Sequence, residues 1–499
     1  MRRLLPLAFA IALNAAPADA QTLRIGLNND PDILDPTLSR TFVGTNVMTG
    51  ICDKLVDLDA NLTIVPRLAL SWEYPDSKTI ILRLRPGVLF HDGEKMDAAA
   101  VKYTIDRHLT FSGSFRRNEL AAADHIEVVD PLTVRVVLKQ PNTAWLAQLT
   151  DRSGMMISPK AAEAAGKDFG LRPVCAGPFK FTERVAQDHI TLDRFEGYWD
   201  KSNIHFDRVV YRPMTDSSVR LANLQAGAVE IADIVPTDAD TVTKNPKLRL
   251  STAGSLGYAG LTINIGPNPA ADTPLGRDAR VRQALSLSID REAVIQVVFA
   301  GQFTANAQPV SPAHPLHVAT HTPPKRDIGR AKALLAEAGV KTPYMVKLMI
   351  PNSPQGVQVG EVVQSMAAEA GIAIQPVVMD FGTALAASQK GDYQIFFIGW
   401  SGLLDPDSNV WSFLHSGAAL NTSGYASAKV DSLLDQARES ADPTTRRGLY
   451  AQVWTQEAQD LPIIYLWSPR YILGHTAKLT GFQTMPDGIM RLQGVKLAP

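Results

Sequence analysis

Short stretches in the N-terminal half of the chain alternate apolar and polar residues. In residues 79–85, TIILRLR, and in residues 132–139, LTVRVVLK, every second side chain is apolar. This period of two places the apolar side chains on one face of an extended chain, so both stretches predict half-buried strands. Pro141 ends the second strand, because proline has no N–H to donate to a sheet. We expect these strands to be antiparallel partners in a small sheet.

Helices and strands alternate between about residues 330 and 400. Residues 327–339, DIGRAKALLAEAG, carry apolar side chains at helical spacing and end in a glycine, which predicts a helix. The expected elements that follow are a strand at 344–350, a helix at 360–371, and strands at 372–379 and 393–400. The last of these, YQIFFIGW, is almost continuously apolar, as expected in a sheet covered on both faces. The alternation predicts an α/β unit.

The size and composition indicate a soluble protein with several packed units. A chain of 499 residues is too long for one simple core, and two or three units are expected. The stretch 264–279, NIGPNPAADTPLGRDA, is the best candidate for a crossing between domains, because it is rich in Pro, Gly, Asn and Asp. Hydrophobic residues make up 45% and charged residues 20%, which is ordinary for a globular protein. The formal net charge of −1 shows no excess of basic residues, so no nucleic-acid partner is expected.

The N-terminus, MRRLLPLAFAIALNAAPADAQ, predicts a secretory signal peptide over residues 1–20. Arg2 and Arg3 precede a short apolar run, and the A-x-A pattern at 18–20 predicts cleavage before Gln21. The alternative is a membrane anchor, but the run is shorter than the roughly 20 apolar residues that span a bilayer. No cysteine follows the run, so no lipid anchor is expected. We expect a soluble periplasmic protein, secreted across the inner membrane with its signal peptide removed.

The chain has two cysteines, Cys52 and Cys175. In an oxidising compartment an even number permits one disulfide. Two buried, unpaired thiols are an equally open alternative. Two cysteines this far apart do not have the spacing of a zinc site.

No enzyme motif is present. The sequence contains no G-x-S-x-G, H-E-x-x-H, P-loop or dinucleotide-binding fingerprint. His314, His317 and His321 cluster in PAHPLHVATHTPP and could attract a metal ion. An irregular, proline-rich surface loop is the favoured interpretation, because the spacing of metal ligands on regular structure is absent. We therefore expect no catalytic residue, no metal site and no cofactor.

The pair His91-Asp92 lies in the segment LFHDGEKMDAAAV and raises the question of an active site. The residues around it predict a short strand, a Gly-dependent turn and then a helix over 98–107. Asp97 lies where an N-cap is needed, so its carboxylate is expected to accept from free N–H groups of the first helical turn. His91 is expected to form a hydrogen bond within the turn. The structural interpretation is favoured over the catalytic one.

The larger stretch 66–104, PRLALSWEYPDSKTIILRLRPGVLFHDGEKMDAAAVKYT, resembles a family signature. It is similar to that of the periplasmic solute-binding proteins of ABC transporters in the peptide/nickel group, the dipeptide/oligopeptide-binding family 5. Further matches follow in the family's order: PVCAGPFKF at 173–181, ARVRQALSLSIDREAV at 279–294 and GWSGLLDPDSN at 399–409. Ala176 stands where the family usually has threonine. The resemblance covers nearly the whole mature chain.

The resemblance implies a two-lobed, hinged α/β fold of the large periplasmic-binding-protein cluster, with a ligand cleft between the lobes. The implied ranges are 21–265 plus 472–499 for the first lobe, 266–471 for the second, and about 60–170 for an extra subdomain in the first lobe. The chain is expected to cross between lobes near 260–266 and 467–474. A solute that binds the closed state more tightly stabilises closure, and a membrane permease recognises that form.

The resemblance also implies part of the binding site. In such proteins the strand that ends in Gly-Trp faces the ligand, which here places Trp400 in the cleft. Its aromatic plane offers a large apolar contact at low entropic cost. Asn264 and Tyr258 are equally plausible as hydrogen-bonding residues at the hinge. The predicted ligand-binding residues are Arg40, Thr41, Phe42, Tyr258, Asn264, Gln358, Trp400, Ser401, Gly402, Asp405 and Asp407.

Two departures from the dipeptide-binding pattern bear on the solute. Leu403 stands where an aspartate usually holds the ligand's amino group, and Val357 and Gln358 stand where an arginine usually holds its carboxylate. Without these anchors the strongest charge-assisted contacts to a free dipeptide are missing. A longer or blocked peptide, glutathione, an opine-like conjugate, a sugar conjugate or another organic solute remains open, and a nickel chelate is the weaker alternative.

Three classes of function would differ in what happens to the bound molecule. A solute receptor, expected to be a monomer, returns its ligand chemically unchanged and delivers it to the permease subunits of an ABC transporter. An exported hydrolase would turn its substrate over, and the pair Asp405 and Asp407 would carry that chemistry; Asp-Pro-Asp in a loop is more often a turn with a helix cap. A chaperone-like peptide holder would bind many peptides weakly. The sequence favours the receptor.

Overall fold

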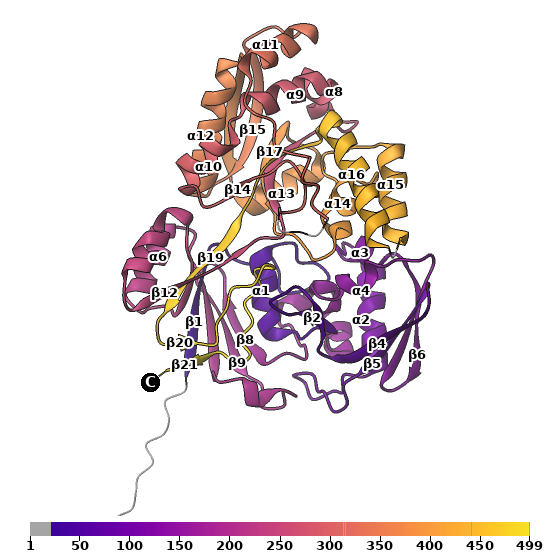
Figure 1. The fold of residues 1–499 in the computed structure, drawn as a ribbon. Coiled ribbons are helices and arrows are strands. Elements are labelled where there is room, and N and C mark those ends of the chain that lie inside the picture. The colour runs from indigo at the N-terminus through magenta and orange to yellow at the C-terminus, as the bar shows by residue number, and fades with distance from the viewer. Residues whose placement is uncertain (1–20, 313, 315, 441, 499) are drawn as a thin grey trace, which may run out of the picture.

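Two lobes, each built around its own sheet, make up the part of the chain that the structure describes (Figure 1). The structure is a computed structural model that describes residues 21–312, 314, 316–440 and 442–498. The predicted signal peptide, residues 1–20, lies outside the described residues. In the view of Figure 1 the N-terminal part forms the lower lobe, and the C-terminal strands return to it from the upper lobe.

The first lobe contains a seven-stranded sheet in the order β12-β19-β11-β1-β10-β9-β8. The first strand of the chain is β1, whose apolar side chains Leu23, Ile25 and Leu27 are buried. It runs parallel to β10 and β11, and the outer strands pair antiparallel. The strands are β1 (Thr22–Leu27), β8 (Phe179–Val185), β9 (His189–Arg194), β10 (Arg208–Pro213), β11 (Ile231–Asp233), β12 (Leu248–Gly254) and β19 (Arg470–Thr476); the helices that pack on them are α1 (Phe42–Ile51), α6 (Ser217–Gln225) and α7 (Ala239–Lys244).

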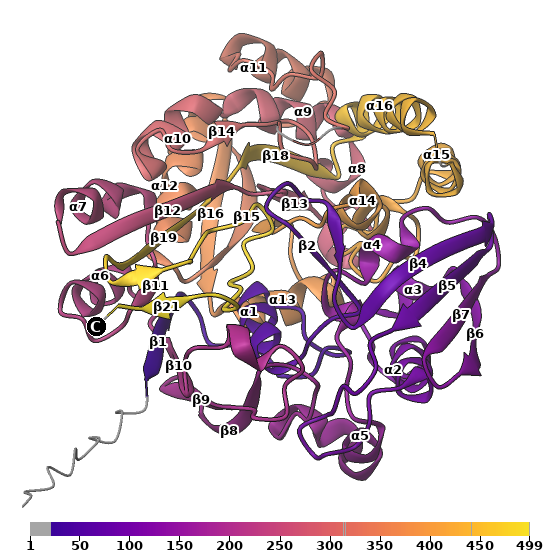
Figure 2. The ribbon, with the colours of Figure 1, turned by 60° about the horizontal axis from the view of Figure 1, so that its bottom comes forward.

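A separate four-stranded antiparallel sheet lies within residues 69–138, beside the main sheet of the first lobe (Figure 2). The predicted partners are adjacent in it, with Leu82 opposite Val134. The period-two pattern buries Ile80, Leu82 and Val136, and leaves Arg83 in solvent. Asp97 caps the helix as predicted, because its side chain accepts from the Ala100 N–H at 3.0 Å. The elements here are β4 (Ala69–Asp76), β5 (Thr79–Leu84), α2 (Ala98–Thr110), α3 (Arg117–Leu120), β6 (Ala123–Asp130), β7 (Thr133–Leu138), α4 (Trp145–Gln148) and α5 (Pro159–Ala165).

The second lobe contains a six-stranded sheet in the order β14-β18-β13-β17-β15-β16. The predicted α/β alternation is present, and β15 pairs parallel with both β16 and β17. The strand β17 is less enclosed than the sequence predicts, because its first residues are buried and its last four are partly or fully exposed. Its elements are β13 (Tyr258–Ile263), α8 (Pro274–Arg277), α9 (Ala279–Ser288), α10 (Arg291–Phe299), β14 (Thr304–Ala305), α11 (Ile328–Glu337), β15 (Tyr344–Pro351), α12 (Pro354–Glu369), β16 (Ile372–Met379), α13 (Phe381–Lys390), β17 (Ile395–Trp400), α14 (Pro406–Leu414), α15 (Ala428–Glu439), α16 (Pro443–Asp460) and β18 (Ile463–Ser468).

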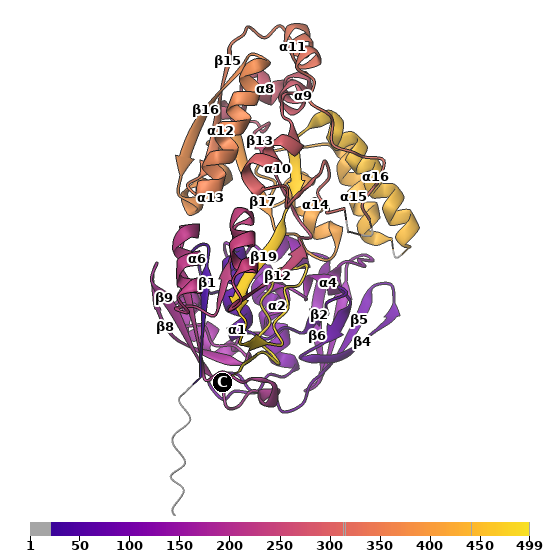
Figure 3. The same ribbon diagram turned by 60° about the vertical axis from the view of Figure 1, so that its left-hand side comes forward.

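The main chain passes between the two sheets at 255–257, from β12 to β13, and at Pro469, from β18 to β19 (Figure 3). The sequence predicts the first boundary at 265, later than this passage. The strand β13 belongs to the second sheet because it pairs with β17 and β18, and all six of its residues are buried. The irregular stretch 264–279 therefore lies inside the second lobe. The second passage falls within the predicted range 467–474 and two residues before the boundary at 471.

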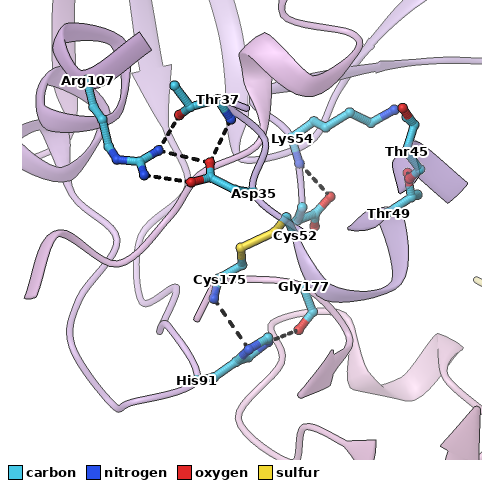
Figure 4. Close-up of a disulfide and its surroundings, with 11 residues drawn as sticks. Asp35, Thr37, Thr45, Thr49, Cys52, Lys54, His91, Arg107, Cys175 and Gly177 are labelled. Atoms are coloured by element: carbon cyan, nitrogen blue, oxygen red, sulfur yellow. Dashed lines mark hydrogen bonds and ion pairs between the residues drawn. A yellow bond between two sulfur atoms is a disulfide. The ribbon is translucent and has the colours of Figure 1, made fainter. Parts of the chain in front are cut away.

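Cys52 and Cys175 form a disulfide with Cα atoms 4.8 Å apart (Figure 4). The alternative of two unpaired thiols does not describe this structure. The bond joins the residue after α1 to the segment before β8, and both cysteines are fully buried in the core of the first lobe.

His91 is part of the same scaffold (Figure 4). Its Nε2 lies 3.0 Å from the Gly177 carbonyl oxygen, and its Nδ1 lies 3.4 Å from the Cys175 N–H nitrogen. A neutral ring satisfies both contacts, because Nε2–H donates and Nδ1 accepts. Burial lowers the pKa of His91 to about 4, which keeps that neutral form at physiological pH. The Asp92 carboxylate accepts from the Ser158 hydroxyl at 2.6 Å, so both residues have structural partners.

Candidate ligand cleft

The end of β17 brings Trp400 to the place where the two lobes meet. The strand pairs antiparallel with β13, so that Tyr258 lies opposite Trp400. The Trp400 ring makes an edge-to-face contact with Phe413, with centroids 5.0 Å apart, and its Nε1–H donates to Asn409 Oδ1 at 2.9 Å. The indole is therefore held in one orientation by both its face and its nitrogen.

A cavity of about 100 Å³ lies against this indole. Its wall is mainly apolar and aromatic, and its polar members are hydroxyl and amide side chains together with one cation. The lining residues are Arg40, Tyr258, Thr262, Phe381, Leu385, Ser388, Gln389, Ile398, Gly399, Trp400, Phe413, Leu420, Thr422, Ser423 and Ile463. Arg40 is the one charged residue among them, and it is also the one that comes from the first lobe. A ligand here would touch both lobes.

Arg40 is positioned by its backbone, which leaves its guanidinium available. The Arg40 N–H donates to Asp32 Oδ2 at 2.7 Å, and the guanidinium lies 4.9 Å from the centre of the Phe115 ring. No described residue forms a hydrogen bond or ion pair with that guanidinium. Burial lowers the pKa of Arg40 and outweighs the opposing effect of Asp32, yet an arginine side chain stays protonated in proteins. The cavity wall therefore carries a positive charge.

Ser401 and Gly402 lie at the two chain passages. The Ser401 carbonyl oxygen accepts from Ser255 Oγ at 3.1 Å and from the Tyr471 hydroxyl at 3.2 Å. Gly402 has φ +82°, and a Cβ at this residue would come within 2.3 Å of the Leu256 carbonyl carbon. Only glycine fits this close approach. This segment therefore joins the end of β17 to the two chain passages between the sheets.

Thr41 and Phe42 lie close to the segment of Ser401 and Gly402, and both have structural partners. Thr41 caps α1, because its Oγ1 accepts from the Gly44 N–H at 3.2 Å and donates to Asp32 Oδ1 at 2.7 Å. The Phe42 ring stacks on Tyr471, with centroids 5.3 Å apart. Phe42 also lines a small space of about 20 Å³ shared by both lobes, together with Thr45, Leu58, Thr150, Asp151, Arg152, Ser401, Gly402, Leu403, Leu404, Asp487 and Ile489.

Asp405 and Asp407 do not line the cavity beside Trp400, because arginines of α15 and α16 hold their carboxylates. Asp405 caps α14 and forms a two-pronged ion pair with Arg446, at 2.9 and 2.6 Å. The Asp407 side chain is 2% exposed and pairs in the same way with Arg438, at 2.9 and 2.7 Å. The structure gives both aspartates a role in holding three helices together.

The structure separates the two hinge candidates. Tyr258 lines the cavity, and its ring meets Tyr465 edge to face at 4.6 Å. Asn264 is buried inside the second lobe, where its Nδ2 donates to the Gly391 and Tyr393 carbonyl oxygens at 2.9 and 2.8 Å. Gln358 is an exposed residue of α12 and does not line the cavity.

Sequence reasoning missed the cavity residues that come from α13 and from the segment after α14. Phe381, Leu385, Ser388 and Gln389 recur at helical spacing and face the cavity from α13. An amphipathic pattern identifies such a face, but it does not say whether the face meets a core or a cleft. Thr422 and Ser423 come from an irregular segment that has no such pattern.

The His314 cluster belongs to a loop with internal bonds. His314 Nε2 lies 3.0 Å from the Leu404 carbonyl oxygen, and His317 Nε2 lies 3.1 Å from Gln308 Nε2. Within the described ranges, no group of three or more His, Cys, Asp or Glu side chains is placed to hold a metal ion.

Two α/β lobes, two chain passages between them and an aromatic cavity at their junction define a hinged, two-lobed ligand-binding protein. The chain belongs to the bacterial extracellular solute-binding proteins of family 5: the model of that family's middle region matches residues 63–421. It is therefore a solute-binding receptor of ABC importers and not an enzyme, and the expected fold class and family are confirmed.

Curated relatives match over almost their full length. The chain is 31% identical over 478 residues to the glutathione-binding protein GsiB of Pectobacterium atrosepticum, covering 93% of this chain and 92% of that one. It is also 31% identical to the glutathione-binding protein GsiB of Salmonella paratyphi A, covering 96% of each chain.

Solved structures share the fold. The binding protein AgaA from A. tumefaciens R10, in complex with agropinic acid, superposes with a TM-score of 0.87 at 26% identity over 96% of this chain and 99% of that one. The oligopeptide-binding protein AppA of Bacillus subtilis has a TM-score of 0.88 at 23% identity, covering 96% of this chain and all of that one (100%), and is similar in fold alone. Within the part of the chain that the structure describes, none of the helices has both the length and the apolar composition needed to cross a bilayer.

Proposed function

We propose that this receptor captures a peptide-like organic acid between its lobes, with a carboxylate of the solute on Arg40 and an apolar part against Trp400. The observation that supports this proposal is the Arg40 guanidinium, which lines the cavity and pairs with no described residue. Bringing a carboxylate to an unpaired, partly desolvated guanidinium gives a strong charge-assisted contact. Because Arg40 comes from the first lobe and Trp400 from the second, such a solute favours closure.

A free dipeptide fits this cavity less well than a solute whose charge is mainly negative. The ammonium group of a dipeptide needs an uncommitted carboxylate, and Leu403 stands where one is usual. The nearby acids Asp405 and Asp407 are held by Arg446 and Arg438. The Asp487 carboxylate beside the hinge is paired with Arg491 at 2.6 Å.

The named ligands of the similar proteins agree with an acidic solute. The curated relatives are described as binding glutathione, and AgaA was solved with agropinic acid. Both compounds carry carboxylates, and glutathione, which also has an ammonium group, is net negative because it has two carboxylates. We therefore place glutathione-like peptides and opine-like acids ahead of nickel chelates for this chain.

The same proposal covers the oligomeric state, the compartment and the delivery of the solute. The receptor works as a monomer in the periplasm after cleavage before Gln21, without a lipid anchor, and delivers its solute to the permease subunits of its ABC importer. In support, the matched family is extracellular, and no cysteine follows the apolar N-terminal run.

The direct test is a binding series by titration calorimetry on the mature protein. Glutathione and agropinic acid are expected to bind saturably and to be recovered unchanged, while a free dipeptide and a nickel–histidine chelate bind at least about 10-fold more weakly, a difference of 1.4 kcal/mol. Arg40→Gln is expected to abolish this preference, and Arg277→Gln, at an exposed ion pair away from the cleft, serves as the matched control. Tighter binding of the nickel chelate, or equal affinity in Arg40→Gln, would contradict the proposal.

A further inference from the structure

A second and larger cavity, of about 300 Å³, lies within the second lobe. It is lined by α9, α10, α16, the start of β18 and the loop that precedes α11, and it shares Ile463 with the cleft cavity. Its lining residues are Gln283, Ser286, Leu287, Arg291, Ala307, His321, Thr322, Pro324, Glu457, Ala458, Leu461, Ile463 and Tyr465. The receptor function described above does not use this space.

Arg291 places an uncompensated positive charge in the wall of this cavity. The residue is 5% exposed, and its guanidinium donates to the Tyr465 carbonyl oxygen at 2.9 Å and to Ser286 Oγ at 3.0 Å. No described carboxylate lies within ion-pair distance of it. Burial lowers the pKa of Arg291 to about 10, so the guanidinium is still charged at neutral pH. Buried charges in proteins are usually paired, and this one has neutral partners alone among the described residues.

Glu457 faces the same cavity with a buried carboxyl group. It is 3% exposed, and burial raises the pKa of its carboxyl group well above the ordinary value. The Tyr465 side chain forms a hydrogen bond with this carboxyl group, but its Oε1 atom has no hydrogen-bond partner in the described part of the chain. An unsatisfied buried polar atom is costly, so a ligand atom that reaches Oε1 would remove that cost.

The other groups around the cavity are neutral or already paired. Burial lowers the pKa of His321, so its imidazole is uncharged at neutral pH. The nearest acid along α16 after Glu457 is Asp460, whose carboxylate accepts from the Tyr425 hydroxyl at 2.6 Å. The apolar part of the wall consists of Leu287, Ala307, Pro324, Ala458, Leu461 and Ile463, and neutral polar side chains come from Gln283, Ser286, Thr322 and Tyr465. The cavity thus combines one positive charge, one carboxyl group whose charged form is disfavoured by burial, and a largely apolar surface.

We propose that this cavity is a second ligand site, separate from the interlobe cleft, which binds a small monocarboxylate with a short apolar body. The carboxylate of the ligand lies between the Arg291 guanidinium, which supplies the opposite charge, and the Glu457 carboxyl group, which supplies a proton donor. The apolar body packs on Leu461 and its neighbours. A cation finds no uncommitted acceptor charge here, and a dianion leaves one charge without a partner.

The test uses the mature protein and sodium butyrate as the probe, with butylammonium chloride and sodium chloride at equal ionic strength. Butyrate is expected to raise the melting temperature saturably, and the two controls are not. Ala458→Trp fills the mouth of the cavity from an exposed position of α16 and is expected to weaken butyrate at least 10-fold. Thr455→Trp, at an exposed position of the same helix that does not line the cavity, is expected to bind butyrate as the unmodified protein does.

Two further variants separate charge from packing and the two sites from each other. Arg291→Met is expected to abolish butyrate binding. Arg291→Lys keeps the positive charge and is expected to retain part of the binding. Arg40→Gln should leave butyrate binding unchanged, and Ala458→Trp should leave the cleft solute unchanged. The proposal is overturned if butyrate gives no saturable shift, if butylammonium shifts the melting temperature equally, or if Ala458→Trp binds butyrate normally.

Discussion

The backbone N–H of Thr143 donates to the carbonyl oxygen of Arg438 at 3.2 Å, and these two residues belong to different lobes. Thr143 Oγ1 also donates to the Ser440 carbonyl oxygen at 3.2 Å. The contact ties the loop after β7 to the end of α15. Since the chain itself joins the lobes at 255–257 and Pro469, these hydrogen bonds form an additional, non-covalent link between the lobes.

Thr143→Ala is expected to weaken solute binding by favouring the open state. It removes the hydroxyl bond to Ser440, and a typical intramolecular hydrogen bond contributes about 0.5–1.5 kcal/mol, which corresponds to roughly 2- to 10-fold in affinity. Calorimetric titration of the cleft solute measures this change. Thr110→Ala removes a similar hydroxyl bond, to the Asp106 carbonyl oxygen within one helix, and should leave the affinity unchanged. Equal affinities in both variants would show that the link does not contribute.

Trp400→Ala is expected to weaken the cleft solute at least about 10-fold, because aromatic anchors in desolvated contacts contribute more than about 1–2 kcal/mol. The affinity of Trp400→Phe should lie between those of the unmodified protein and Trp400→Ala, since this variant keeps an aromatic plane and loses the hydrogen bond to Asn409. Trp72→Ala, in the four-stranded sheet, is the matched control. Circular dichroism checks that each variant is folded before its affinity is compared, and a normal affinity in Trp400→Ala would remove Trp400 from the site.

Asp407→Asn is expected to lower the free energy of unfolding by about 3–5 kcal/mol, because it leaves the buried Arg438 guanidinium without its carboxylate. Urea denaturation measures this loss. The affinity of the folded variant for the solute should stay the same, which distinguishes a structural aspartate from a ligand-binding one. Asp240→Asn, whose side chain is 84% exposed, should change the stability by less than about 0.5 kcal/mol.

Removing the disulfide with Cys52→Ser and Cys175→Ser together is expected to destabilise the protein by about 2–4 kcal/mol, since the bond closes a long loop in the unfolded chain. The sequence separation of the two cysteines is 123 residues. Solute affinity should be unchanged, because both cysteines lie in the core of the first lobe. Dithiothreitol should reproduce the loss in the unmodified protein and have no effect on the double variant; an equal effect on both would point to another cause.

His91 is expected to make the protein less stable in mild acid. Its folded pKa of about 4 lies below the ordinary value of 6.5, so the unfolded chain takes up a proton before the folded one does. Stability is complete above pH 6.5 and falls as the pH is lowered towards 4, by up to about 3 kcal/mol. Comparing urea denaturation of the unmodified protein and His91→Gln at pH 7 and pH 5 isolates this contribution from those of other buried histidines. Identical pH dependence in the two proteins would contradict it.

Local structure was predictable where a few neighbouring residues decide it. Asp97 caps its helix as expected, because its carboxylate and the N–H group it accepts from are three residues apart. The alternation in 79–85 and the family signature around His91 also depend on short spans of sequence. The candidate site was predicted less completely, since its walls come from segments that are far apart.

The sequence by itself determined the strands and helices, the receptor family and the place of Trp400 at a strand end, because side-chain periodicity and short motifs carry this information. Only the tertiary structure decided which partners the polar side chains meet. In that structure Asp405 pairs with Arg446 and Asp407 with Arg438, and β13 belongs to the second sheet. The Arg40 guanidinium lies in the cleft without an ion-pair partner among the described residues. The reason is physical: a charge is neutralised by whatever lies beside it in space, and sequence spacing does not specify that neighbour.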